Sequence, residues 1–206
     1  MTLLRIKKYI QNYFRYLLHN PKKYWNRQGG VKYFTQFHSS EPRYEEIFIE
    51  HIKNFKPNSL IDIGCGYGRY SMALKEEFPN LHTVGVDISA SQIEFARDYC
   101  KIFPDIELYE VDGKYLPFDN GSFDMAITYG CLSAVKVSHI RKFFKEIQRI
   151  TRNYGVFLEY FPSKDDNRFT DHIYWYKHDY IGLFNGKMIM NQKLNENGDT
   201  LFIVKF

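Results

Sequence analysis

The sequence predicts an α/β protein in which helices cover both faces of a parallel sheet and an antiparallel hairpin closes one edge. From residue 59 onward, short apolar segments alternate with helical patterns, separated by Gly, Pro and Asn. Near the C-terminus, two further strand-like segments flank Asn197-Gly198, a strong hairpin signal. The 206 residues are 44% hydrophobic and 25% charged, an ordinary globular composition that excludes a wholly disordered chain.

The first 40 residues form a basic leader. They contain eight of the 28 Lys and Arg residues and no Asp or Glu, so 20 basic and 24 acidic residues remain in 41–206. Between Leu3 and Leu18, apolar residues recur at intervals of three and four, which predicts an amphipathic helix that ends at Asn20-Pro21. We consider three roles for it: a lid on the body, a contact with an anionic membrane surface or polyanion through residues 1–20, and an organellar presequence.

After the leader helix we expect a loop at residues 24–30 and a second helix at residues 45–55. Residues 1–56 are thus predicted to form a helical N-terminal cap, and residues 57–206 the α/β body. Apolar segments bounded by turn residues predict body strands at 59–63, 83–86, 106–111, 124–128 and 155–161, followed by hairpin strands at 187–194 and 200–204. Amphipathic segments predict helices at 70–78, at 91–100 (with Ser89 or Ser91 as the cap) and at 137–152.

The cysteine content favours a reducing compartment. Cys65, Cys100 and Cys131 are an odd number of widely spaced thiols, which does not suit a disulfide framework. No uninterrupted apolar run approaches the roughly 20 residues that a membrane span requires. We therefore expect a cytoplasmic protein.

A glycine-rich loop follows the first strand directly. In Asp62-Ile63-Gly64-Cys65-Gly66-Tyr67-Gly68 the glycines alternate, so the backbone can turn sharply and approach a ligand, while the next helix turns its free amides toward the same place. The dinucleotide fingerprint would need another glycine at Arg69, and no Gly-Lys-Ser/Thr follows as in a phosphate-binding loop. The carboxylate of Asp62 suits a ligand with an ammonium group better than a pyrophosphate.

Three acidic residues stand at the ends of three successive strands. Asp62, Asp87 and Asp112 are spaced 25 residues apart. In an open sheet, ligands bind beyond the carboxyl ends of the strands, and an acid after the second strand can accept both hydroxyl groups of a ribose. Asp112 with Gly113 can contact the edge of an adenine. Together the three acids predict a site for adenosine with an amino-acid tail.

Residues 60–161 resemble the class I S-adenosylmethionine-dependent methyltransferases of the small-molecule type. The resemblance rests on segments 61–69, 85–89, 112–113 with 116–118, 122–124, and 146–150 before 153–155. It implies a Rossmann-like, doubly wound, seven-stranded sheet whose last strand is inserted antiparallel. This chain departs from the family in having Asn153-Tyr154-Gly155 where Pro-Gly-Gly is usual, and in having Tyr67 where a small residue is more common.

The resemblance also implies a cofactor, S-adenosyl-L-methionine, with S-adenosyl-L-homocysteine as its product. Asp62, Gly64 and Gly66 would hold the methionine part, Asp87 the ribose, and Asp112 with Gly113 the adenine. Residues 128–131 would lie beside the sulfonium, and Tyr67 would cover the tail. The predicted cofactor-binding residues are Asp62, Gly64, Cys65, Gly66, Tyr67, Gly68, Asp87, Ile88, Asp112, Gly113, Thr128, Tyr129 and Gly130.

Methyl transfer needs a base only when the acceptor must lose a proton. Candidates are His172, His178 and His139, with Tyr129 as a further one that better suits the cofactor wall; for each histidine, an exposed or packing role is the alternative. Aromatic residues in 169–184, together with Tyr24-Trp25, could cover a pocket for an apolar or aromatic acceptor. The acids and histidines of 171–179 match no established ligand spacing, so we expect no metal.

Two other functions stay open at this point. The chain could be a nucleic-acid (RNA) methyltransferase that uses the basic leader, although the acidic body and the absence of an Asn/Asp-Pro-Pro-Tyr/Phe motif argue against this partner. It could also be a non-catalytic module that binds the cofactor. We expect a monomer or a homodimer acting on a small molecule.

Overall fold

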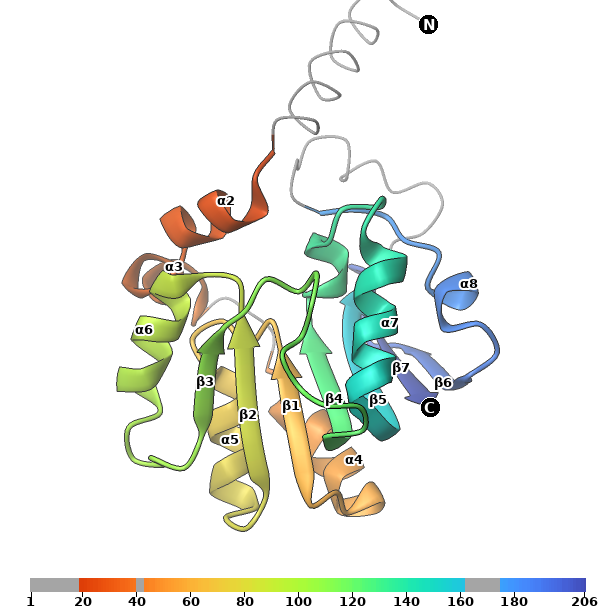
Figure 1. Cartoon of the computed structure of the whole chain (residues 1–206), viewed down its shortest axis with the longest axis horizontal. Coiled ribbons are helices and arrows are strands. Elements are labelled where there is room, and N and C mark those ends of the chain that lie inside the picture. The colour runs from red at the N-terminus through yellow and green to blue at the C-terminus, as the bar shows by residue number, and fades with distance from the viewer. Residues whose placement is uncertain (1–18, 40–42, 162–174) are drawn as a thin grey trace, which may run out of the picture.

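The computed structural model describes residues 19–39, 43–161 and 175–206, so the predicted leader helix lies outside the described residues (Figure 1). The described helices are α2 (Pro21–Gln28), α3 (Val31–Phe37), α4 (Glu45–Phe55), α5 (Arg69–Glu77), α6 (Ala90–Tyr99), the short 3₁₀ helix η1 (Leu132–Ala134), α7 (Ile140–Ile150) and α8 (Tyr180–Phe184). The strands are β1 (Ser59–Ile63), β2 (His82–Asp87), β3 (Glu107–Glu110), β4 (Phe123–Tyr129), β5 (Thr151–Tyr160), β6 (Met188–Lys193) and β7 (Asp199–Lys205). Among the helices in this part of the chain, none is long and apolar enough to cross a membrane.

Seven strands form one twisted sheet in the order β3-β2-β1-β4-β5-β7-β6. Strands β1 to β5 are parallel, and β7 runs antiparallel between β5 and β6. Because these five strands are parallel, their carboxyl ends lie at one edge of the sheet, uppermost in Figure 1. Strands β2 and β3 follow on one side of β1, and β4 and β5 on the other. The predicted parallel sheet with an antiparallel C-terminal hairpin is confirmed.

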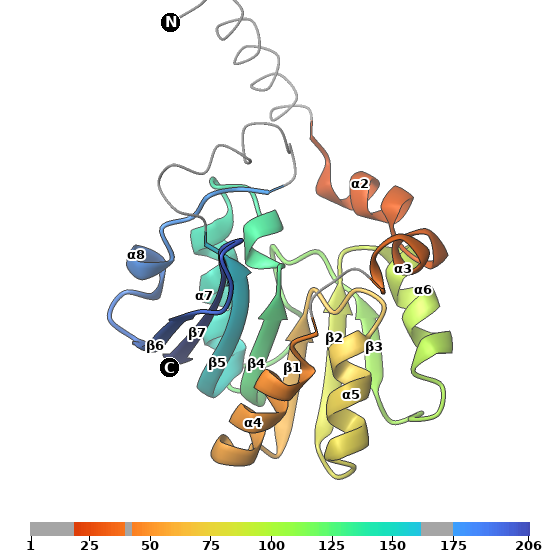
Figure 2. The same ribbon diagram turned by 180° about the vertical axis from the view of Figure 1, so that it is seen from behind.

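Three hydrophobic clusters fill the space between the sheet and its helices, the smallest of them between α6 and β3. On one face, Phe48 of α4 and Leu74 of α5 pack on Leu60 and other strand residues. On the other, Ile147 of α7 and Phe184 of α8 pack on the opposite side of the same strands. Helices α4 and α5 lie behind the sheet in Figure 1 and in front of it in Figure 2, where α7 lies behind. This arrangement agrees with the uniformly buried strand β1, which both faces cover.

The predicted loop at residues 24–30 is wrong, because most of it belongs to helix α2. Asn20 and Pro21 begin this helix: the Asn20 side chain accepts a hydrogen bond from the Lys23 amide (3.0 Å), and proline fits the first helical position, which needs no amide donor. The same two residues that end a preceding helical pattern therefore start a new one.

The predicted helix at residues 137–152 is also too long, since α7 covers only Ile140–Ile150. Strand β5 starts at Thr151 rather than at Gly155, because Thr151 pairs with Phe123 at the beginning of β4. Arg152 is held in the strand by its hydrogen bonds to Asp124 (2.7 and 3.0 Å). The contacts that decide this boundary come from residues about 28 positions away, which local periodicity does not show.

Candidate functional site

A cavity of about 610 Å³ opens at the carboxyl edge of the sheet. Its wall combines the residues after β1, β2, β3, β4 and β5 with the start of β7 and the cap helices α2 and α3. Most of the predicted cofactor-binding residues line it: Gly64, Cys65, Gly66, Tyr67, Asp87, Ile88, Asp112, Gly113, Tyr129 and Gly130. The remaining three, Asp62, Gly68 and Thr128, lie outside the lining.

The glycine loop has a backbone that side chains would disturb. Gly64, Gly66 and Gly68 have φ values of +75°, +56° and +83°, in the left-handed region that favours glycine. A Cβ on Gly64 would lie 2.6 Å from the Cys131 sulfur, whereas a Cβ on Gly66 would meet only the Gln92 amide nitrogen, at 3.6 Å. The loop therefore packs tightly on β4's end while its middle leaves room toward the cavity.

Asp87 connects the glycine loop to the cavity. Its carboxylate accepts hydrogen bonds from the Gly66 amide (3.0 Å) and the Ser89 amide (2.8 Å), and it lines the cavity. Burial raises the pKa of this carboxyl to about 6, although the backbone donors act in the opposite direction. A carboxylate can accept more than these two hydrogen bonds, so Asp87 can still bind a ligand hydroxyl group.

Asp62 does not line the cavity, although its place at a strand end predicts that it would. Its side chain is 2% exposed, accepts a hydrogen bond from the Ser71 hydroxyl (2.7 Å), and lies beneath the loop. Burial raises its pKa to about 7, and the nearby charge of Asp87 adds to this. Asp62 therefore supports the loop from the core side.

At the other end of the cavity, Asp112 is exposed and pairs with Lys114 (2.9 Å). Partial burial raises the pKa of Asp112, but the hydrogen bonds and charge of Lys114 outweigh it, and the pKa is lowered. A Cβ on Gly113 would collide with the Phe143 ring, so only glycine fits here. Lys22 of α2 reaches the same end and pairs with Glu110 (2.6 Å).

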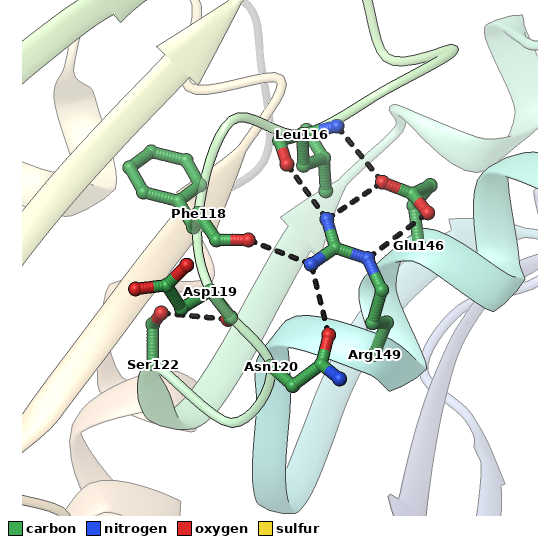
Figure 3. A network of polar contacts seen from close by, with 7 residues as sticks. All are labelled: Leu116, Phe118, Asp119, Asn120, Ser122, Glu146 and Arg149. Atoms are coloured by element: carbon green, nitrogen blue, oxygen red, sulfur yellow. Dashed lines mark hydrogen bonds and ion pairs between the residues drawn. The ribbon is translucent and has the colours of Figure 1, made fainter.

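The loop between β3 and β4 is anchored on α7 by a network of polar contacts (Figure 3). The Arg149 guanidinium donates to the carbonyl oxygens of Leu116 (2.7 Å) and Phe118 (2.6 Å) and to the Asn120 side chain (3.2 Å). Glu146 accepts from Arg149 and from the Leu116 amide (3.0 Å). These contacts hold the loop that carries Asp112 and Gly113 toward the cavity.

Glu159 is a site residue that the sequence reasoning missed. Its carboxylate is 1% exposed and accepts four hydrogen bonds: from the Thr128 hydroxyl (2.7 Å), the Leu132 amide (3.0 Å), and the Ser133 amide (3.0 Å) and hydroxyl (3.1 Å). Burial raises its pKa despite these donors. The turn after β4, where Gly130 and Cys131 line the cavity, is thus held by β5. The available signal was a single acid inside the apolar segment 155–161.

The cap packs on the start of α6 through residues that the sequence did not mark. The Gly30 amide donates to the Gln92 side chain (2.9 Å), and the Ser91 hydroxyl donates to the Asn26 carbonyl oxygen (2.8 Å). A Cβ on Gly29 would lie within 2.8 Å of the same α6 residues. Tyr67 of the glycine loop contacts His38 of the cap (3.0 Å).

The candidate bases differ in whether they line the cavity. His139 precedes α7 and Tyr129 ends β4, and both line the cavity, whereas His172 lies outside the described residues. His178 is buried away from the cavity lining, and burial lowers its pKa. Trp25 and Trp175, from the two aromatic segments, both line the cavity. Cys65, Cys100 and Cys131 are free thiols, and burial raises the pKa of each.

Methyltransferases recur among the known proteins to which this chain is similar. A family model described as a methyltransferase domain matches residues 60–155. Pavine N-methyltransferase from Thalictrum flavum subsp. glaucum is 24% identical over 155 residues, 68% of this chain and 42% of that protein. Malonyl-[acyl-carrier protein] O-methyltransferase from Legionella pneumophila is 28% identical over 110 residues, 53% of this chain and 38% of that protein. The chain thus spans about two fifths of the length of these relatives.

Solved structures show the same fold at low sequence identity. A putative O-methyltransferase from Nostoc punctiforme matches with a TM-score of 0.67 and 15% identity, covering 79% of this chain and 55% of that one. A protein from Pyrococcus horikoshii matches with a TM-score of 0.65 and 20% identity, covering 85% of this chain and 92% of that one.

Proposed function

Residues 60–155 are a class I S-adenosylmethionine-dependent methyltransferase domain, and from this premise we propose that the chain methylates a small apolar or aromatic acceptor. The observation that carries the proposal is the position of Asp87. Its carboxylate faces the 610 Å³ cavity while it holds the amide of Gly66 in the open part of the glycine loop. This position supports the proposed role of Asp87 as the acid that binds the ribose, beside a backbone that a ligand can approach closely.

The residues present fit S-adenosyl-L-methionine. The cavity volume lies in the usual range for small-molecule sites, about 300–1,000 Å³. Gly64 and Gly66 would hold the methionine part, Asp87 the ribose, and Asp112 with Gly113 the adenine. Cys65, Tyr67, Ile88 and residues 129–131 would complete the wall, with Asp62, Gly68 and Thr128 supporting it from behind.

When bound, the cofactor supplies an electrophilic methyl group on its sulfonium. The chain's own contribution is to orient the acceptor and exclude water, which can supply several kcal/mol of the barrier reduction. Trp25, Trp175 and Tyr160 provide aromatic walls for the acceptor. For an acceptor that must lose a proton, two of the candidate bases, His139 and Tyr129, line the cavity, and His172 stays a candidate.

The proposal extends to the N-terminal cap, the reacting atom of the acceptor, the cellular compartment and the oligomeric state. We propose that residues 1–56 form a cap that closes the cofactor cavity of residues 57–206, because α2 contributes Lys22 and Trp25 to its wall. The relatives' names refer to both N- and O-methylation, so they leave the reacting atom of the acceptor open. We propose a reducing compartment such as the cytoplasm, since the three thiols are free. We also propose a monomer or homodimer.

The proposal is tested by incubating the full chain with methyl-labelled S-adenosylmethionine and fractionated cell extract. We expect calorimetry to show binding of the cofactor and the label to enter a small organic acceptor. Label recovered only in nucleic acid would support the RNA methyltransferase alternative instead. Cofactor binding with no transfer to any fraction would indicate a binding module.

A further inference from the structure

Asp199, the first residue of β7, adds a carboxylate to the cavity that the cofactor does not account for. It lies at the carboxyl edge of the sheet because β7 is antiparallel and Asp199 pairs with Tyr160 at the end of β5. The Tyr44 hydroxyl (2.9 Å) and the Asn195 side-chain amide (2.8 Å) both donate to its Oδ2 atom. The Asp199 amide donates in turn to the Asn195 side chain (3.1 Å), so the carboxylate has a defined orientation.

Tyr44, which donates to this carboxylate, is the first of a row of neighbouring tyrosine rings. The Tyr44 ring lies 6.1 Å from Tyr129, and the Tyr129 ring lies 5.1 Å from Tyr70. Tyr70, Tyr129 and Tyr160 line the cavity together with Asp199. Aromatic faces attract cations, and a carboxylate beside them can bind one through a charge-assisted hydrogen bond. This chemistry recognises an ammonium group attached to an apolar body.

The neighbouring charges are compatible with a cation at this position. Arg69 also lines the cavity, but Glu45 binds its guanidinium through two hydrogen bonds (2.8 and 3.2 Å), which compensate its charge. Glu159 uses its carboxylate to hold the turn after β4. Lys136, His139 and Lys142 enter the cavity from the side of α7, on the opposite face of the sheet from α4. His19, Lys22 and Lys114 also line it; Lys22 pairs with Glu110 and Lys114 with Asp112.

We propose that Asp199 and the tyrosines Tyr70, Tyr129 and Tyr160 form an acceptor subsite for an amine, with Asp199 binding its ammonium group. This inference rests on the proposed function, because it places the amine beside the cofactor part of the same cavity. It narrows the acceptor from an apolar or aromatic molecule to one that also carries a basic nitrogen.

Tryptophan fluorescence can test the subsite directly, because the two tryptophans of the chain, Trp25 and Trp175, both line the cavity. The full chain, saturated with S-adenosylhomocysteine, is titrated with benzylamine, with the neutral benzyl alcohol and with the anionic benzoate. We expect benzylamine to bind about tenfold more tightly than benzyl alcohol, the effect of one charge-assisted hydrogen bond. Benzoate should bind most weakly.

The matched variants are Asp199→Asn and Glu196→Gln. Asp199→Asn keeps an oxygen for Tyr44 and Asn195 but removes the charge, so benzylamine should lose its tenfold advantage while benzyl alcohol binds as before. Glu196 is on the same hairpin with a 99% exposed side chain, and Glu196→Gln should change neither ligand. Equal weakening of amine and alcohol by Asp199→Asn would overturn the proposal. The proposal would also be overturned if the wild type bound benzoate more tightly than benzylamine and benzyl alcohol.

Calorimetry with S-adenosylhomocysteine separates this inference from the proposed function. We expect wild type and Asp199→Asn to bind it equally. If the wild type shows no binding, the proposed function fails, and the titration is then repeated without S-adenosylhomocysteine to decide whether Asp199 binds an amine at all. If Asp199→Asn alone loses affinity, Asp199 belongs to the cofactor site and the subsite proposal is wrong.

Discussion

At the scale of single residues, the three acids at the strand ends differ in their surroundings although their spacing is uniform. Asp87 lines the cavity, Asp112 is exposed at its end, and Asp62 is buried beneath the glycine loop. Each position therefore predicts a different experimental consequence.

Asp87→Ala should weaken cofactor binding while the fold survives. The variant loses a charge-assisted acceptor for a ligand hydroxyl, so we expect calorimetry to show cofactor binding that is weaker by about 1–3 kcal/mol. Asp98→Ala on α6 is the control, because Asp98 is exposed and contacts only Lys101 among the interactions described for it. An unchanged affinity in Asp87→Ala would remove the support for a ribose contact.

Asp62 predicts a pH dependence of stability. Its pKa is raised from 3.8 to about 7 in the folded chain, so the folded state holds a proton that the unfolded state releases between about pH 4 and 7. The contribution of Asp62 to the unfolding free energy therefore falls as pH rises through this window. We measure the free energy of unfolding of wild type and Asp62→Asn in urea at pH 5 and pH 8. Buried histidines such as His51, whose pKa is lowered, make both proteins more stable as pH rises, and this effect cancels in the difference between them. We expect the unfolding free energy of Asp62→Asn minus that of the wild type to be larger at pH 8 than at pH 5. Equal differences at the two pH values would contradict the raised pKa.

Glu159→Gln should destabilise the turn that follows β4. An amide group offers one acceptor oxygen where the carboxylate has two, so at least one of the donors from Leu132 and Ser133 faces an NH₂ group. We expect the unfolding free energy to drop by about 1–3 kcal/mol in urea titrations. Glu94→Gln, on the exposed side of α6, provides the control and should leave stability unchanged.

At the scale of elements, the Arg149–Glu146 pair shows how a helix can hold a loop (Figure 3). Both residues lie within the segment 146–150 on which the family resemblance partly rested. The structure supplies the physical reason for this segment: its side chains satisfy the carbonyl oxygens of Leu116 and Phe118 and the amide of Leu116.

Arg149→Met should loosen the loop between β3 and β4. The variant removes the guanidinium that donates to both carbonyl oxygens, and we expect a loss of about 1–3 kcal/mol in the free energy of unfolding. Amide hydrogen exchange should accelerate in residues 113–121, and Arg141→Met at an exposed position of the same helix should show neither effect. Unchanged exchange in this loop would show that the network is dispensable.

The bounds of a helix or strand could be predicted from the sequence where residues close to its ends determine them. Helix α4 has the predicted bounds, and α6 begins after Ser89, one of the two proposed caps, whose hydroxyl accepts from the Gln92 amide. The errors lie where two signals overlap or a distant partner intervenes. Asn20-Pro21 suits both the end of one helix and the start of another, and the early start of β5 depends on β4.

At the scale of the whole molecule, the cap and the body share one cavity, and Gln92 joins them. Gln92→Ala removes the acceptor for the Gly30 amide, so we expect limited proteolysis to cut residues 21–38 faster than in the wild type. Cofactor affinity should decrease as well, because α2 contributes to the cavity wall. Glu94→Ala, on the exposed side of the same helix, should resemble the wild type in both measurements. If Gln92→Ala is cut no faster, the contact does not hold the cap.

By itself the sequence determined the fold class, the order of the strands along the chain and the glycine loop with its acids, because alternation, periodicity and turn residues are properties of neighbouring positions. Only the tertiary structure decided which side chains share the cavity. Gln92, Glu159 and Asp199 contribute to its wall from three separate parts of the chain, and Asp62 lies outside it. The reason is physical: burial and hydrogen bonding at this edge depend on how the sheet orders its strands, and that order joins residues far apart in the sequence.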